Sequence, residues 1–406
     1  MPAPVAVPDP RSPADTAELL KSWALEAGFD RAGVASLEPS RDGEAFLRWL
    51  ARGDQAGMEY LGRRIEARLE PATILPGARS ALCVTLQYHP LEDEAGERLP
   101  EAFAPDNDLW PRVARYARGR DYHDVMERRL KRLAARIAEA FPGVMSRPYV
   151  DTGPVLEREL AARAGLGVVG KNTNLLHREA GSWFLLGELF LTLDLSPDAP
   201  LTDLCGSCTR CLQACPTDAL REPYHLDANR CISYWTIEHR GAFPPEVREG
   251  VGDWVFGCDV CQEVCPWNYK ARGAHHPELE LPPQRAELDL AGLLRLRREE
   301  FVERFQVSPM KRPKLAGLQR NAAVAMGNRG DERYVAPLAE ALADAGDGGD
   351  GDDGAALDPL VRAHAAWALG RIGGEEARRA LLEALTGERD EAVRQEILQA
   401  LRTLSD

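Results

Sequence analysis

The N-terminal half of the chain alternates between stretches with helical spacing of apolar residues and short runs that are apolar throughout. Residues 14–27 have apolar side chains at helical spacing, as does a shorter stretch around 46–50. The apolar runs at 31–35 and 80–87 have the length and composition of buried strands. This alternation of helices and strands predicts an α/β unit.

The same two patterns continue further along the chain. Residues 124–141 and 155–164 have amphipathic patterns that predict a long helix and a shorter one. A glycine-rich loop at 165–173 follows, and then a predicted strand at 183–193. Cys83 lies inside one of the apolar runs described above, and we interpret it as a small core residue.

The C-terminal part of the chain repeats a helical pattern. The sequence NAAVAMG at 321–327 recurs as HAAWALG at 364–370, and 393–404 carries a weaker third copy. Repeats of this kind are typical of paired helices of the HEAT type. A stretch rich in Asp and Gly at 344–358 separates the first two copies and is expected to be an acidic surface loop.

Composition restricts the setting in which the protein works. The chain of 406 residues begins with a proline-rich, polar stretch that lacks the apolar segment of a signal peptide. No apolar run is long enough to cross a membrane. We therefore expect a soluble, cytoplasmic protein without a membrane partner, in a reducing compartment where thiolates stay available for metal.

The net charge of −14 argues at first against a nucleic-acid partner, but the distribution of charge matters more than its sum. Basic residues are concentrated in three short stretches, at 128–132, 295–298 and 311–314. Taken alone, each stretch is most simply a solvated face. A local basic surface can nevertheless bind a polyanion while the rest of the surface is acidic.

The cysteines carry the strongest chemical signal. Eight of the nine lie between residues 205 and 265, in two runs with Cys231 alone between them. The first run has the Cys-x2-Cys-x2-Cys-x3-Cys-Pro spacing of bacterial ferredoxins, in which three thiolates bind one [4Fe-4S] cluster and the fourth binds a second cluster. The second run is one cysteine shorter, and Cys231 supplies the missing thiolate because two clusters need eight.

The predicted ligands form two sets, which are Cys205, Cys208, Cys211 and Cys265 for one cluster and Cys215, Cys231, Cys258 and Cys261 for the other. A pair of structural zinc sites is the alternative, because two Cys-x2-Cys pairs also supply four thiolates. The third cysteine of the first run, and the Cys-Pro that closes both runs, favour iron–sulfur clusters.

Three further places are candidates for a binding site. The polar and aromatic stretch 115–123 precedes a predicted helix, where ligand contact and helix capping are equally good interpretations. Arg68 lies in a loop, as a surface charge or an anion contact. Asp151 follows a short apolar pair, and its simplest interpretation is a helix cap. A carboxyl at the mouth of an apolar cavity can also have a raised pKa and deliver a proton.

Six short motifs follow one another between residues 116 and 266. They are YARGRDYH (116–123), VDTGP (150–154), AGLGVVGKN (164–172), CGSCTRCLQACP (205–216), RCISY (230–234) and GCDVCQEVCP (257–266). With these motifs the chain resembles the epoxyqueuosine reductases, which carry out the last step of queuosine synthesis in tRNA. The combination is far more specific than the ferredoxin spacing alone.

The resemblance implies an N-terminal domain that binds cobalamin beside the two clusters. Electrons would pass from the clusters to cobalt and reduce the epoxide on the wobble base, with Asp151 as the proton donor. The implied cobalamin contacts are Arg68, Ala114, Asp151, Leu175, Leu186 and Ser233. Some members have a cysteine where this chain has Ala114, so no sulfur contact is implied there. The anticodon stem-loop of the tRNA would lie against Lys311, Arg312, Lys314, Arg320 and Arg362.

The prediction is therefore an α+β oxidoreductase that acts as a monomer with an unidentified electron donor. Its expected domains are an α/β corrinoid-binding domain at 1–195, a ferredoxin-like domain at 196–275, and a linker with HEAT-like helical repeats at 276–406. Two other functions stay open. A corrinoid reductase of a small molecule, such as a dehalogenase, usually carries an export signal. A plain electron-transfer protein would need no corrinoid domain.

Overall fold

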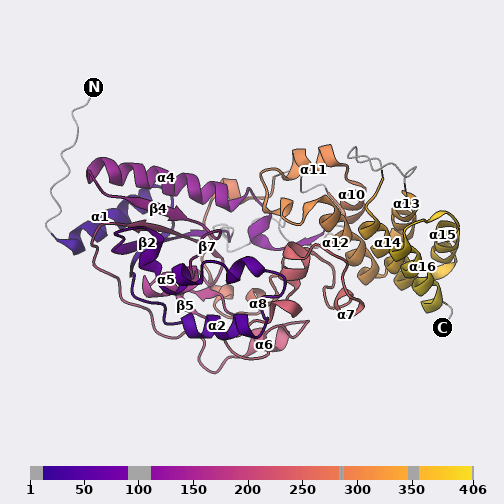
Figure 1. Ribbon diagram of the computed structural model, residues 1–406, viewed down its shortest axis with the longest axis horizontal. Coiled ribbons are helices and arrows are strands. Elements are labelled where there is room, and N and C mark those ends of the chain that lie inside the picture. Colours follow the sequence, from indigo (N-terminus) through magenta and orange to yellow (C-terminus); the bar gives the residue numbers. More distant parts are fainter. Residues whose placement is uncertain (1–11, 90–110, 283–284, 286–287, 346–355, 405–406) are drawn as a thin grey trace.

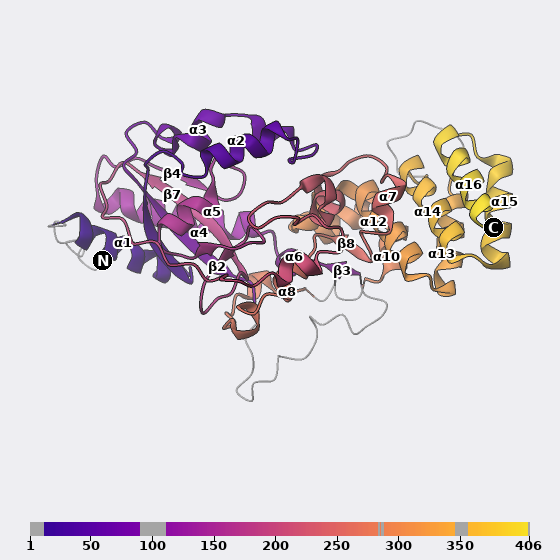
Figure 2. The same cartoon turned by 90° about the horizontal axis from the view of Figure 1, so that it is seen from below.

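The computed structural model describes residues 12–89, 111–282, 285, 288–345 and 356–404. The molecule is elongated, with the sheet at one end, the C-terminal helices at the other and the cysteine-rich segment between them (Figure 1). The view from below shows the same order along the long axis (Figure 2). Among the described helices, none is both long and apolar enough to span a bilayer. Most of the predicted acidic loop lies outside the described residues.

A four-stranded sheet with the order β1-β2-β7-β4 organises the N-terminal part. Its strands are β1 (Arg31–Ser36), β2 (Ser80–Gln87), β7 (Phe184–Leu191) and β4 (Ser146–Tyr149). All three pairings are antiparallel, and β2 pairs with β7 over its whole length. The strands predicted at 31–35, 80–87 and 183–193 are confirmed, and the combination of this sheet with separate helices confirms the α+β class.

Helices cover both faces of this sheet. Alternate residues of β2 point to opposite faces, so Leu82 and Val84 join the core formed with α1 and α4, whereas Cys83 joins the core formed with α5. Cys83 is fully buried, and this burial raises the pKa of its thiol, which confirms it as a core residue. The helices are α1 (Pro13–Glu26), α4 (Tyr122–Ala140) and α5 (Glu157–Arg163), with α2 (Gly43–Ala51) and α3 (Ile65–Leu69) in the connection between β1 and β2.

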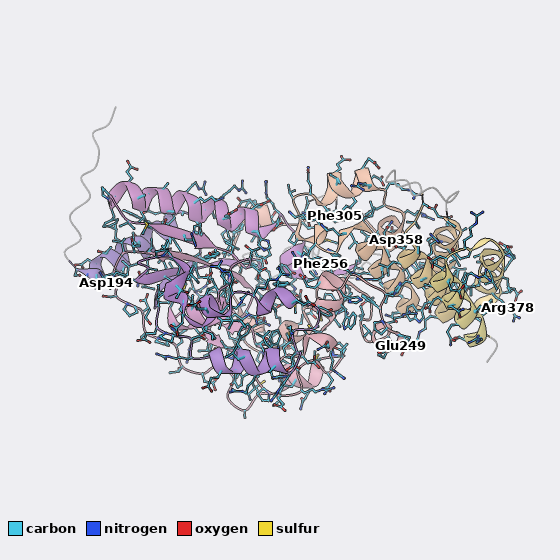
Figure 3. All side chains as sticks on the ribbon, viewed as in Figure 1. Asp194, Glu249, Phe256, Phe305, Asp358 and Arg378 are labelled. Carbon is cyan, nitrogen blue, oxygen red and sulfur yellow. The ribbon has the colours of Figure 1, made fainter. Side chains whose placement is uncertain are left out.

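The cysteine-rich segment has short elements only. They are α6 (Arg210–Ala214), α7 (Pro245–Arg248), β8 (Trp254–Phe256) and α8 (Val260–Glu263). Strand β8 pairs in parallel with β3 (Arg112–Val113), so it ties this segment to the chain just before α4. Phe256 lies near the middle of the molecule (Figure 3). Its ring packs against Tyr116 and belongs to the same core as the C-terminal helices.

The three repeat copies form equivalent helices, and α14 packs between α12 and α16. The C-terminal helices are α10 (Leu290–Arg295), α11 (Arg298–Phe305), α12 (Lys314–Arg329), α13 (Val335–Ala343), α14 (Pro359–Ile372), α15 (Gly374–Gly387) and α16 (Glu391–Thr403). Glycine ends two of the copies because these helices approach closely. A Cβ atom on Gly370 would lie 2.6 Å from the Cβ of Ala400. The predicted helical repeats are therefore confirmed.

Two arginines expected to contact tRNA are buried inside this helical part, and that expectation is wrong. Arg320 is fully buried and donates to the backbone carbonyls of His239 and Gly241. Arg362 forms a buried ion pair with Glu388, at 3.0 Å. Both guanidinium groups are occupied by acceptors of the protein itself. Arg362 links α14 to the C-terminal end of α15, and Arg320 links α12 to the turn that follows Cys231.

Candidate functional site

A cavity of about 360 Å³ lies between the sheet domain and the cysteine-rich segment. Its volume is within the range of small-molecule sites. The side chains that line it include three tyrosines, three acids, apolar residues of β7 and four cysteines. Those that carry the argument below are Tyr88, Tyr116, Tyr122, Asp151, Glu157, Leu175, Leu186, Ser233, Cys215, Cys231, Cys258 and Cys261.

Cys205, Cys208, Cys211 and Cys265 lie near one another in one cysteine group, and Cys215, Cys231, Cys258 and Cys261 lie near one another in a second, with Cys211 and Cys261 also near each other. Cys205 and Cys208 lie close enough to Cys265 for their charges to raise its pKa, after the larger effect of burial. In the same way burial, and then the charges of Cys231 and Cys215, raises the pKa of Cys258. Within the described residues, no three Cys, His, Asp or Glu side chains converge closely enough to bind a single metal ion.

The hairpin of β5 (Val168–Val169) and β6 (Leu175–Leu176) reaches both cysteine groups. The backbone N–H of Lys171 donates to Cys205 Sγ, with 3.4 Å between N and Sγ. Asn174 Nδ2 lies 3.8 Å from Cys261 Sγ. N–H groups that point at sulfur stabilise the thiolate and adjust the potential of a bound cluster. This contact gives the glycine-rich motif a physical role, because its turns bring backbone amides next to the sulfurs.

Asp151 is surrounded by polar groups from the N-terminus of α4. Tyr122 donates its hydroxyl hydrogen to Asp151 Oδ2, at 3.1 Å, and His123 Nε2 lies 3.3 Å from the same oxygen. The other ring nitrogen, His123 Nδ1, lies 2.7 Å from Asp121 Oδ1. Asp121 in turn pairs with Lys311, at 2.8 Å. The imidazole is therefore held between two carboxylates.

These contacts decide where the proton lies. Partial burial opposes a charge on His123, but the hydrogen bonds to Asp121 and Asp151 outweigh it and raise the pKa of the imidazole to about 9. Burial likewise opposes the charge on Asp151, yet the hydrogen bond and the charge of His123 keep the pKa of this carboxyl below its usual value. At neutral pH, His123 is therefore the protonated member and Asp151 the ionised one.

The interpretation of Asp151 as a helix cap is wrong. Helix α5 begins at Glu157, its N-cap position is Leu156, and no side chain caps it. Asp151 instead has a left-handed backbone, with φ of 57°. In the stretch 115–123, the capping interpretation is confirmed for Asp121, and ligand contact stays a prediction. Asp121 caps α4 by accepting the N–H of His123, at 3.2 Å, while Tyr122 faces the cavity.

The residues expected to contact cobalamin separate into two groups. Asp151, Leu175, Leu186 and Ser233 line the cavity. Arg68 is buried and is not among the lining residues. It donates to the carbonyl of Val155, and its Nε has no hydrogen-bond partner among the described residues. Ala114 is buried against Gly257, where a Cβ would lie 2.6 Å from the Ala114 Cβ. The alanine side chain is therefore enclosed by protein.

Sequence reasoning did not foresee the contacts of several groups at this site. His123 stood in a noted motif, but only its contact with Asp151, 28 residues away, shows what it does. Lys311 was expected at a tRNA surface, and it also pairs with Asp121. Arg312 pairs with Glu238, at 2.9 Å. This hydrogen bond raises the pKa of Arg312, and the charges of Tyr60 and Asp151 add to the effect, so the basic pair lies beside the acid end of the cavity.

Family models match along the chain. A model described as a 4Fe-4S double cluster binding domain matches residues 204–268, and the model "Epoxyqueuosine reductase QueG, DUF1730" matches 68–152. The PBS lyase HEAT-like repeat matches 318–344, and the HEAT repeats model matches 355–402. The chain thus carries a domain of the kind that binds two 4Fe-4S clusters.

Curated relatives match over nearly the whole length. An epoxyqueuosine reductase from Xanthomonas campestris is 42% identical over 379 residues, covering 92% of this chain and 100% of the relative. One from Pseudomonas aeruginosa is 39% identical over 365 residues, covering 90% of this chain and 96% of the relative.

Solved structures agree with these matches. The crystal structure of an epoxyqueuosine reductase with an epoxyqueuosine-modified tRNA-Tyr stem loop has a TM-score of 0.82 at 32% identity, covering 96% of this chain and 98% of that one. The Bacillus subtilis epoxyqueuosine reductase, with its aspartate-bearing catalytic loop swung out of the active site, has a TM-score of 0.84 at 32% identity, covering 95% and 98%. By identity, coverage and fold, this chain belongs to the epoxyqueuosine reductase family.

Proposed function

We propose that this protein reduces epoxyqueuosine to queuosine at the wobble position of tRNA. The observation that carries the proposal is that four cysteines of one group and the Asp151 carboxyl line the same cavity. Removal of an epoxide oxygen as water consumes electrons and protons at one place. An electron source and an acid must therefore meet at one substrate, whereas a plain electron-transfer protein needs no acid. With tRNA as the substrate, we expect a monomer that works in the cytoplasm.

The proposed cluster ligands are the two sets of four cysteines defined above. Their grouping in space supports this assignment, and so does the match to a double cluster domain. Burial raises the pKa of thiols such as Cys205 and Cys265. Iron lowers these pKa values, because a thiol that coordinates the metal does so as the thiolate and releases its proton to solvent. The nearby N–H groups of Lys171 and Asn174 favour the same thiolate form.

The residues present are compatible with cobalamin. Leu175 and Leu186 offer an apolar wall, Ser233 offers a hydroxyl, and the buried Nε of Arg68 is a donor that no group of the described protein satisfies. Such an orphaned buried donor is costly unless a ligand accepts from it. We propose these residues as cobalamin contacts, and when bound there, the cofactor would supply a strong reductant beside the clusters. Ala114 is not among them, because it is enclosed by protein.

The proton is supplied by this chain. His123 holds it at neutral pH, and its Nε2 is 3.3 Å from Asp151 Oδ2. In the proposed role, the ionised Asp151 takes the proton from His123 and passes it to the epoxide oxygen. Asp121 and Lys311 keep the imidazole oriented, since Asp121 accepts from Nδ1 and is itself fixed by the lysine. This arrangement resembles other sites in which a second group sets the proton content of the first.

The substrate is proposed to approach past Lys311 and Arg312. Both side chains are exposed, and the acid partner of Arg312 is Glu238. Ion pairs at the surface contribute little stability, so Arg312 can exchange the Glu238 carboxylate for a phosphate at low cost. Because the same two residues lie beside Asp121 and Asp151, a bound stem-loop would present its wobble base to the cavity.

The ligand assignment predicts the iron content of cysteine variants. Replacing Cys208 or Cys261 by Ser should remove one cluster each, so anaerobically reconstituted protein should hold about half of the wild-type iron. Cys83→Ala is the matched control, because Cys83 is a core residue outside both groups, and it should retain full iron. Full iron in both Ser variants would contradict the assignment.

The proton-donor role predicts the effect of Asp151→Asn. Asn keeps the shape and the hydrogen bond to Tyr122 but has no acidic proton, so turnover should fall by about 10² to 10⁴-fold. Iron, cobalamin and tRNA binding should stay normal. Asp194→Asn is the matched control, since Asp194 is exposed at the sheet end of the molecule (Figure 3). If the Asp151 variant turns over at the wild-type rate with saturating tRNA, another group is the acid.

The basic pair predicts the salt dependence of tRNA binding. The double variant Lys311→Ala, Arg312→Ala should bind the tRNA more weakly, and each lost phosphate contact should lower the slope of log affinity against log salt by about 1. Arg378 and Arg379 supply the control, because both are exposed on α15 at the far end of the molecule, where Figure 3 shows Arg378. An equal loss in the control pair would show that binding is spread over the whole surface.

A further inference from the structure

Glu188 is a carboxyl buried in the middle of the sheet. It is the charged residue of β7, whose other residues are apolar or glycine, and it is fully buried. Among the described residues, no N–H or hydroxyl group donates to either of its carboxyl oxygens. An ionised carboxylate without donors is too costly to bury, so Glu188 is held in its protonated form.

The partner of Glu188 is Glu157, the first residue of α5. The two carboxyls lie close together, since the charge of Glu157 adds to the larger effect of burial in raising the pKa of Glu188. Burial, and next the charge of Asp151, raises the pKa of Glu157 to about 8, and burial raises the pKa of Glu188 well above its usual value. The pair therefore holds at least one proton at neutral pH, as carboxyl pairs in contact must.

Glu157 also holds the backbone of Asp151. Its Oε1 accepts the N–H of Asp151, at 2.5 Å. Asp151 has φ of 57°, a conformation that costs a residue other than glycine roughly 1–2 kcal/mol. Because Glu188 stands opposite Tyr149 in the sheet register, the chain leaves β4 directly above the carboxyl pair and turns at Asp151. The hydrogen bond to Glu157 therefore holds a strained turn in place.

This turn directs the Asp151 carboxyl toward Tyr122 and His123. We propose that Glu157 is a positioning residue for the reaction: by accepting the Asp151 N–H, it fixes the Asp151 backbone so that the Asp151 carboxyl meets His123 at the cavity. The inference rests on the proposed function, in which Asp151 is the acid. The other ionisable groups facing the carboxyl pair are Arg158, Arg68, Tyr122 and Cys83.

Two variants separate positioning from mere structure. Glu157→Gln keeps an acceptor oxygen for the Asp151 N–H and offers an N–H donor to Glu188, so the anchor survives. The double variant Glu157→Met, Glu188→Leu removes both carboxyls and fills their space with apolar side chains. Replacing a buried polar pair in this way is often neutral or stabilising, so this variant is expected to fold. This Met/Leu variant has no carboxyl oxygen to accept the backbone N–H of Asp151.

Hydrogen exchange of the full-length protein measures the anchor without any cofactor. In the Met/Leu variant, the amide of Asp151 should exchange about 10- to 100-fold faster, which corresponds to one lost hydrogen bond to a carboxyl. Amides of β2 and β7 should stay protected as in the wild type, because the sheet is intact. The Gln variant should protect Asp151 like the wild type. In the loaded enzyme, kcat should fall in the Met/Leu variant with KM for tRNA unchanged, and Gln should restore kcat to within a few-fold.

Wild-type protection of the Asp151 amide in the Met/Leu variant would overturn the inference. Equal loss of protection in the Gln variant would also overturn it, because Gln preserves the acceptor. The exchange result is independent of the acid role of Asp151. If Asp151→Asn proves fully active while the Met/Leu variant frees the amide, the proposed acid is wrong and the anchor stands.

Discussion

Each cysteine group draws on both ends of the cysteine-rich segment, and this connectivity constrains what surrounds it. Cys265 of the last run lies with Cys205 and Cys208 of the first, whereas Cys215 of the first run lies with Cys258 of the last. The chain between the runs must therefore return on itself, which brings α6 beside α8. One group then forms a wall of the cavity. In the proposed function, the electron source and the substrate site are consequently parts of one structure.

Opposite the cysteine group, on the other side of the site, a row of ionisable groups runs from the surface to the sheet. It begins at Lys311 and continues through Asp121, His123 and Asp151 to the carboxyl pair of Glu157 and Glu188. At the outer end, opposite charges alternate, so each group keeps its neighbour ionised. At the inner end, burial forces the carboxyls to keep a proton. Asp151 lies between the charged groups of the outer end and the protonated carboxyls of the inner end, which suits a residue that gives up a proton and regains it.

The spacing of apolar residues predicted the strands and helices, because it records which face of each element is buried. The observed sheet confirms the predicted strands. The cysteine groups were predictable because the spacing and the number of thiolates leave few alternatives. The partners of Asp151 were not predictable, because they come from α4, and the sequence neighbours of Asp151 suggest a cap. Arg320 and Arg362 resemble surface cations in sequence, and only their buried acceptors distinguish them. Glu188 did leave a signal, as a single carboxyl in an apolar strand.

The most direct test of this account is the conversion of an epoxyqueuosine-modified tRNA stem-loop under anaerobic conditions. Protein reconstituted with iron and sulfide, supplied with an artificial low-potential reductant, would be assayed by mass spectrometry of the stem-loop with and without cobalamin. The account predicts loss of one oxygen atom from the modified base only when cobalamin is present. An unchanged stem-loop with fully loaded protein, or equal conversion without cobalamin, would contradict it.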